Sequence, residues 1–129
     1  MFKKLFAKKE ISLSGAPPVR RLKTYSAQSG YVFQYYYEGQ RVREHDTEFV
    51  FTISADRTHW TPARVLLDAA AISTWECSHE RTLQANERYG IAKMALFQAF
   101  DTRETPSLMA SEVLVGETDI ETIVGMLEL

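Results

Sequence analysis

This sequence lacks most of the features that mark disulfide-bonded, metal-binding and nucleotide-binding proteins. It has a single cysteine, Cys77, among 129 residues, which excludes an internal disulfide. It contains no C-x-x-C or H-x-x-x-H pair, and its six glycines fit neither a G-x-G-x-x-G nor a P-loop pattern. We therefore expect neither a metal nor a cofactor.

Long apolar runs are also missing from the sequence. No stretch approaches the ~20 apolar residues that are needed to cross a bilayer. Lys8 and Lys9 interrupt the apolar residues 5–7 too early for a secretory signal peptide. A lone cysteine is also typical of a reducing compartment. We therefore expect a cytoplasmic protein, and a chain of 129 residues predicts one domain rather than two.

The net charge of −2 conceals an uneven distribution along the chain. Residues 1–24 carry seven basic groups and one acidic group, a net charge of +6, whereas residues 25–129 carry eight and sixteen, a net charge of −8. Pro17 and Pro18 interrupt regular structure within the basic segment. We therefore divide the chain into a basic N-terminal arm, 1–24, and a single domain, 25–129.

The most apolar segment spans residues 87–100, where Lys93 and Gln98 are the only polar side chains between Tyr89 and Phe100. Its apolar residues cover nearly all sides of a helical wheel, so a helix here must be covered on nearly all sides. We expect it to end near Arg103, to form the centre of the fold, and to bury Ala92, Leu96 and Phe100 against a sheet.

Alternating side chains predict two long strands, 31–37 and 48–54, and short apolar runs predict two more, 63–67 and 111–115. Gly39 marks a bulge or bend, and the polar stretch 41–47 is read as a turn region. With helices over 69–81, 87–103 and the C-terminus, the order is β-β-β-α-α-β-α. This order predicts an α+β domain in which an antiparallel sheet of three to four strands has its helices packed on one face.

Three helix starts are suggested by capping residues. Asp68 precedes the helix over 69–81, and Asn86 precedes the apolar helix. Thr118 and Glu121 have the spacing of a capping box at the start of the C-terminal helix.

The candidates for catalysis or metal binding are few. Cys77 and His79 are two positions apart in the sequence, so on a helix their side chains diverge by about 160° and cannot act as a nucleophile and base. His45, Asp46 and His59, with Cys77, form a site only if the fold brings them together.

The aromatic residues admit two interpretations. Tyr31, Phe33 and Tyr35 share one strand face and can stack nucleobases or form the core, and the net charge of −8 on the domain favours the core. Tyr36 points to the opposite face, where it can mark a contact surface. Lys93 is either an amine of lowered pKa or, as we favour, a chain whose stem lies along apolar neighbours with its ammonium exposed.

The favoured function is a small non-catalytic protein-binding or assembly domain that self-associates as a homodimer or other homo-oligomer. Its expected interaction surface consists of five residues: Phe2, Leu5, Phe6, Tyr36 and Lys93. The first three fall at helical spacing within residues 1–10, which can also meet a membrane surface.

Two alternative functions remain open. One is a small enzyme or metal-dependent hydrolase that uses His45, Asp46, His59 and Cys77. The other is attachment to nucleic acid or an anionic membrane through the basic arm. Of these polyanions nucleic acid is the less favoured, because the acidic domain repels it.

Overall fold

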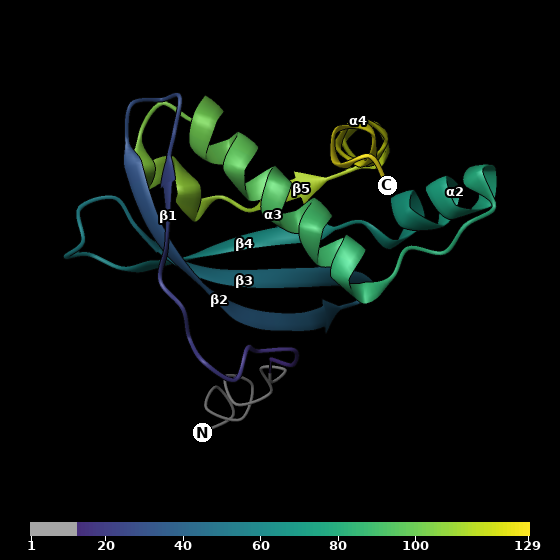
Figure 1. The fold of residues 1–129 in the computed structure, drawn as a ribbon, viewed down its shortest axis with the longest axis horizontal. Helices are drawn as coiled ribbons and strands as arrows, with labels where there is room; N and C mark the ends of the chain where they lie inside the picture. Colours follow the sequence, from purple (N-terminus) through teal and green to yellow (C-terminus); the bar gives the residue numbers. More distant parts are fainter. Residues whose placement is uncertain (1–12) are drawn as a thin grey trace, which may run out of the picture.

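The computed structural model describes residues 13–129, and it has the α+β architecture that the sequence predicts (Figure 1). Phe2, Leu5 and Phe6 lie outside the described residues. The elements in chain order are β1 Lys23–Ser26, β2 Val32–Arg43, β3 Asp46–Ser54, β4 Thr61–Leu67, α2 Ala69–His79, α3 Ala85–Thr102, a 3-10 helix Pro106–Ala110, β5 Val113–Val115 and α4 Glu117–Leu127.

The sheet has five strands in the order β1-β2-β3-β4-β5 and is mixed, which corrects the predicted antiparallel sheet of three to four strands. The first four strands form an antiparallel meander, whereas β5 pairs with β4 in parallel. The parallel pairing arises because α3 carries the chain back along the sheet after α2, so that β5 starts again at the end where β4 started (Figure 1).

The additional strand, β1, is short and polar, with the sequence Lys-Thr-Tyr-Ser, and three of its four residues are exposed. A strand at the edge of a sheet that buries few side chains does not need alternating apolar residues. The sequence of β1 therefore has no apolar alternation by which the strand could be recognised. It begins at Lys23, so the last two residues of the basic segment 1–24 take part in the sheet.

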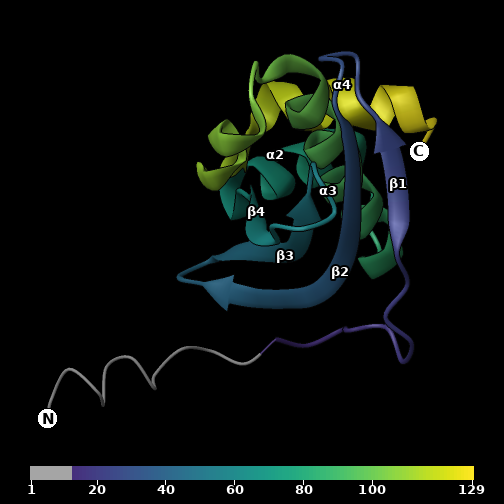
Figure 2. The ribbon, with the colours of Figure 1, turned by 90° about the vertical axis from the view of Figure 1, so that its left-hand side faces the viewer.

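The sheet curls around its helices. Figure 2 shows β2 bending strongly along its length, and the pairing of β2 with β3 shifts register between Tyr37 and Gly39. This bulge is the irregularity that Gly39 predicts, and a bulge increases the local bend of a strand. The helices α2, α3 and α4 all lie on the concave side of the curled sheet, and within residues 13–129 no helix covers the opposite face (Figures 1 and 2).

The core lies between the concave sheet face and α3. Ala92, Leu96 and Phe100 are fully buried, as predicted, and Phe100 stacks on Phe33 with 4.0 Å between ring centroids. Phe49 and Phe51 of β3 are fully buried on the same side. These residues come from the alternating positions of the strands, so the aromatic face is core rather than a nucleobase platform.

Several boundaries differ from those expected. Residues 41–43 and 46–47 continue the hairpin strands instead of forming a turn, and the chain reverses at Glu44, where φ is 59°. The predicted cap Asp68 is confirmed, since its side chain accepts a hydrogen bond from Ala70 N at 3.1 Å. The N-cap of α3 is Gln84 rather than Asn86.

The capping prediction for the last helix is wrong. The helix starts two residues earlier than expected, with Gly116 as N-cap, and the Asp119 carboxylate accepts from Gly116 N at 2.9 Å. Thr118 and Glu121 therefore lie inside the helix.

Within residues 13–129, no helix combines the length and apolar character needed to span a membrane.

Candidate functional site

The histidines and acids that sequence analysis singled out are separated by the fold. His45 and Asp46 lie at the turn where β3 begins, whereas His59 follows the end of β3. Nine residues of strand separate these ends, which corresponds to about 30 Å of chain. The Asp46 carboxylate accepts from Ala69 N at 2.8 Å at the start of α2, and His59 Nδ1 lies 2.7 Å from Asp56. Asp46 and His59 therefore each contact residues at their own end of the sheet, and these two ends are opposite.

Cys77 and His79 diverge on α2. Cys77 is exposed, while the His79 ring stacks on Trp75 with 4.4 Å between centroids, and its Nε2 lies 3.1 Å from a carboxylate oxygen of Glu121 on α4. Among residues 13–129, no three histidine, cysteine or acidic side chains are grouped so that they can hold a metal ion.

A pocket lies instead where the chain enters the sheet. Ser14 and Gln40 exchange two backbone hydrogen bonds of 2.8 Å, and Lys23 then pairs with Tyr35. Between these two pairings, the chain that enters the sheet contains eight residues, 15–22. The facing stretch of β2 contains only four residues, 36–39. The longer segment bows away from the sheet edge, and we refer to residues 15–22 as the arch.

Gly39 permits the close approach at the first end of the arch. Its φ of +130° is disfavoured for residues with a side chain, and a Cβ at this position would lie 2.8 Å from the Ser14 carbonyl oxygen. A Cβ would also lie 3.1 Å from the Cβ of Leu13. The bulge in β2 and the attachment of the arch therefore depend on the same glycine.

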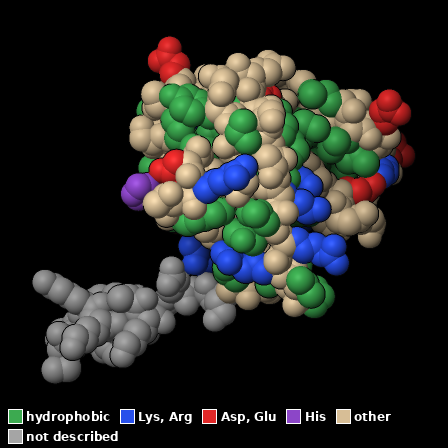
Figure 3. Space-filling view, turned by 60° about the vertical axis from the view of Figure 1, so that its left-hand side comes forward, with side chains coloured by type: hydrophobic (Ala, Val, Ile, Leu, Met, Phe, Trp, Pro, Cys, Tyr) green, Lys and Arg blue, Asp and Glu red, His purple; other side chains and the backbone are tan. Residues whose placement is uncertain are grey.

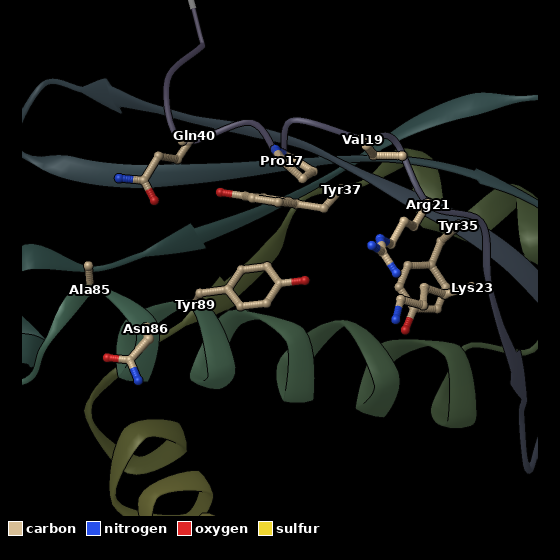
Figure 4. Close-up of a pocket in the computed structure, with 11 residues that line it drawn as sticks. Pro17, Val19, Arg21, Lys23, Tyr35, Tyr37, Gln40, Ala85, Asn86 and Tyr89 are labelled. Atoms are coloured by element: carbon tan, nitrogen blue, oxygen red, sulfur yellow. The ribbon is translucent and has the colours of Figure 1, made fainter.

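Arg20 fixes the middle of the arch from outside. Its guanidinium lies 3.9 Å from the centre of the Tyr36 ring and makes an ion pair with Glu38, which also accepts from Thr52 Oγ1 at 2.5 Å. Because side chains alternate along extended chain, the neighbouring Arg21 turns inward when Arg20 turns outward. Figure 4 shows Arg21 on the pocket side of the arch.

The pocket has a volume of about 450 Å³ and is open to solvent. Its walls are the arch, the concave side of β2 and the first turns of α3 (Figure 4). The described residues that line it include three tyrosines, two cations and two amides, and none is acidic: Gly15, Pro17, Val19, Arg21, Lys23, Tyr35, Tyr37, Gln40, Ala85, Asn86 and Tyr89.

The polar groups are sorted to the two ends of the pocket. In Figure 4, Arg21, Lys23 and the hydroxyl groups of Tyr35 and Tyr89 gather at one end, while the amides of Gln40 and Asn86 lie toward the other. The rings of Tyr37 and Tyr89 occupy the middle, with 4.7 Å between their centroids.

Burial shapes the electrostatics of this pocket. It raises the pKa of Tyr35 and of Tyr37 to about 12, with a smaller contribution from Tyr89, so both phenols are protonated at neutral pH. Lys93 lies beside the cationic end, with its ammonium 5.9 Å from the centre of the Tyr35 ring. Its pKa is lowered by burial and, to a smaller extent, by the charge of Lys23. Figure 3 shows lysine and arginine side chains interleaved with hydrophobic ones on the lower half of the face in view.

The second notable surface is the outer face of the sheet, opposite the helices. The strand register places Tyr36, Thr52 and Pro62 in one row and Glu48, Leu66 and Leu114 in another. Trp60 joins the first row through the Tyr36 ring, with 5.5 Å between centroids. Leu114 is 67% exposed and Trp60 is 37% exposed.

Arginines surround one buried carboxylate on this outer face. Glu48 is fully buried and lies 2.6 Å from Arg41 Nε and 2.8 Å from Arg43 Nη1. Arg64 approaches it at 3.9 Å, and Arg43 also pairs with Glu112. The face therefore combines apolar side chains with paired charges of both signs.

Two of the five expected interaction residues can be located. Tyr36 lies on the outer face, and Lys93 lies half-buried next to the pocket. Sequence reasoning did not identify Arg21, Tyr37 or Tyr89 as pocket residues, and the sequence Val-Arg-Arg-Leu-Lys over 19–23 has no alternation that would mark Arg21. Comparison with known proteins gives no significant match to a family model, a curated protein or a solved structure.

Proposed function

We propose that this protein is a non-catalytic protein-binding domain that self-associates through the outer face of its sheet. The observation that supports the proposal is the row formed by Tyr36, Trp60 and Pro62 on a sheet face that none of the described helices covers. Tyrosine, tryptophan and arginine are the residue types that contribute most to binding energy at protein interfaces.

A second copy of the chain is the partner that fits this face best. The outer face carries arginines and glutamates side by side, so a copy related by a two-fold axis presents acids to basic groups and basic groups to acids. Leu66 and Leu114 lie next to each other on the same face and supply apolar area that a dimer would bury.

The test is a charge placed on Leu114, the most exposed apolar residue of the outer face, at the end of the row that contains Glu48 and Leu66. We expect the native protein to sediment at twice its mass of 14.8 kDa at micromolar concentration, and Leu114→Glu to sediment as a monomer with unchanged circular dichroism. Leu114 is already largely exposed, so this substitution adds no buried charge to the single chain.

The matched control is Met126→Glu, which places the same charge on an exposed apolar residue of α4, outside the sheet. It should leave the dimer intact. A native protein that sediments as a monomer, or a dimer that survives Leu114→Glu, contradicts the proposed interface.

The two alternative functions draw less support from the arrangement of residues. The candidates for an enzyme, His45, Asp46, His59 and Cys77, lie apart. Polyanion attachment depends mainly on lysines within residues 1–12, which lie outside the described part of the chain. A cytoplasmic location is part of the proposal, and it rests on the single exposed thiol of Cys77.

A further inference from the structure

We propose that the pocket beneath the arch binds a small aromatic carboxylate whose far end carries a hydrogen-bonding group. This site is separate from the outer face of the sheet, because the pocket opens on the concave side of β2. The two proposals can therefore fail independently.

The size and walls of the pocket suit a small organic molecule. A volume of about 450 Å³ falls within the ~300–1,000 Å³ range of ligand pockets, which combine apolar walls with a few placed polar groups. Pro17, Val19 and Ala85 contribute apolar surface, and Tyr37 and Tyr89 contribute ring faces and edges. Aromatic rings pack favourably on such surfaces in offset or edge-to-face arrangements.

The charge of the ligand follows from the cations that have no partner. Between residues 13 and 129, the arginines at positions 20, 41, 43, 64, 81 and 88 all make ion pairs. Arg21, Lys23 and Lys93 make none within this range, and Arg21 and Lys23 line one end of the pocket. Arg57 and Arg103 also make none there, but Arg57 is exposed in the β3–β4 loop and Arg103 donates to three backbone carbonyl groups. The two cations at this end of the pocket, with Lys93 beside them, favour an anion there.

The phenol hydroxyl groups add donors to the pocket: two lie at the cationic end, whereas that of Tyr37 points toward the end where Gln40 lies. Those of Tyr35, Tyr37 and Tyr89 make no hydrogen bond within the described chain, whereas Tyr25, outside the pocket, donates to Asp101 at 2.8 Å. Figure 4 places the hydroxyls of Tyr35 and Tyr89 beside Arg21 and Lys23. A carboxylate accepts hydrogen bonds through two oxygens, so it can use a cation and a phenol together.

The opposite end of the pocket determines which second polar group the ligand should carry. The Gln40 and Asn86 amides each offer a donor and an acceptor, and they lie beyond the tyrosine rings from the cations (Figure 4). A molecule that reaches both ends has a carboxylate, a ring and a terminal hydroxyl or amide. 3-(4-Hydroxyphenyl)propionate is a suitable probe of this class.

The test is calorimetric titration of the full chain with this probe and with its neutral amide. We expect the acid to bind with a Kd of about 0.1–1 mM, a reasonable affinity for so small a ligand. The amide should bind at least tenfold more weakly because it lacks the charge. Equal binding of acid and amide, or no binding of either, overturns the proposal.

Substitutions locate the site. Arg21→Gln and Lys23→Gln should each weaken binding of the acid about tenfold, as expected for loss of a charged hydrogen bond. Arg57→Gln is the matched control, because Arg57 is exposed in the β3–β4 loop and makes no ion pair within residues 13–129. If Arg57→Gln weakens binding as much as Arg21→Gln, the anion is held by general charge and the pocket is not the site.

A steric variant tests the pocket without changing its charge. Ala85→Phe places a ring at the exposed start of α3 inside the pocket and should reduce binding at least tenfold, with an unchanged melting temperature. Retained binding in this variant overturns the assignment.

A peptide that ends in phenylalanine is titrated in parallel. If the peptide binds while the free acids do not, the pocket is a protein-docking site and our proposal is wrong.

Discussion

At the scale of single residues, Glu48 stands out because it is the charged residue that is fully buried within residues 13–129. Burial alone raises the pKa of its carboxyl, but hydrogen bonds from Arg41 and Arg43 outweigh burial, and the pKa lies below its ordinary value. A carboxylate whose pKa is lower in the folded than in the unfolded state stabilises the fold at neutral pH. That contribution is lost as the pH falls from the unfolded pKa, about 4.3, through the folded value.

We therefore expect Glu48→Gln to lower the free energy of unfolding at pH 7 by about 1–3 kcal/mol, because charged hydrogen bonds to two arginines become neutral ones. The variant should also lose less stability than the native protein when the pH falls below about 4.3. Urea denaturation across this pH range measures both effects. Glu104→Gln, at an exposed position, is the control, and an identical acid response in the native and Glu48→Gln proteins contradicts this role for Glu48.

At the scale of elements, the C-terminal helix shows the limit of capping rules. Both Thr118 with Glu121 and Gly116 with Asp119 have the required spacing of three residues. The structure uses the second pair, because the helix follows directly after β5 and must begin at the strand end. Glycine has no side chain to complete the box, so only the Asp119 carboxylate contributes a capping bond.

This choice predicts different costs for two neighbouring substitutions. Asp119→Ala should lower the free energy of unfolding by about 0.5–1 kcal/mol, because Gly116 N loses its acceptor and the helix start loses a negative charge. Thr118→Ala should change it by less, since Thr118 is exposed within the helix. Thermal denaturation of the two variants decides the matter. A larger loss for Thr118→Ala would restore the capping box that the sequence first suggested.

Local sequence patterns predicted the strands and helices well wherever one face of the strand or helix is buried. The strands around Phe33 and Phe51 alternate in the sequence, and the helix around Leu96 is apolar on most sides, so each could be identified alone. The strands extend further than predicted because polar residues such as Arg41 and Glu48 pair across the outer face. A pattern of polar residues cannot distinguish such a paired strand from a turn.

The pocket could not be predicted from local patterns, because it depends on distant segments meeting. Arg21 and Tyr89 are far apart in the sequence, and the arch joins them only because Ser14 pairs with Gln40. Gly39 was recognised as a bulge, but the approach of Ser14 to it depends on tertiary contacts. Pairings of this kind leave no periodic signal.

At the scale of the whole molecule, the entering chain is bound to the sheet rather than to a broad acidic surface. Of the arch residues, Arg20 pairs with Glu38, whereas Arg21 faces the pocket. The acidic domain is thus joined to a basic patch that carries the proposed ligand site. The lysines at positions 3, 4, 8 and 9 precede this attachment and lie outside the described residues.

Two truncations separate the roles of these parts. Removal of residues 1–12 should leave the fold and binding of the aromatic acid unchanged, because the Ser14–Gln40 pairing and all of the described pocket residues remain. Removal of residues 1–24 deletes the arch and half of β1, including the pairing of Lys23 with Tyr35. The shorter protein should remain folded around α3, melt at a lower temperature and bind the acid at least tenfold more weakly.

Circular dichroism, sedimentation and calorimetry of both truncated proteins provide these measurements. Loss of acid binding on removing residues 1–12 alone would mean that this segment completes the pocket.

Binding to DNA, RNA or anionic vesicles is measured in parallel at about 150 mM salt, where weak contacts between exposed charges are screened. If removing residues 1–12 abolishes such binding and leaves the dimer intact, the lysines before the arch form a polyanion anchor. In that case the alternative function through the basic arm replaces self-association as the better account of this segment.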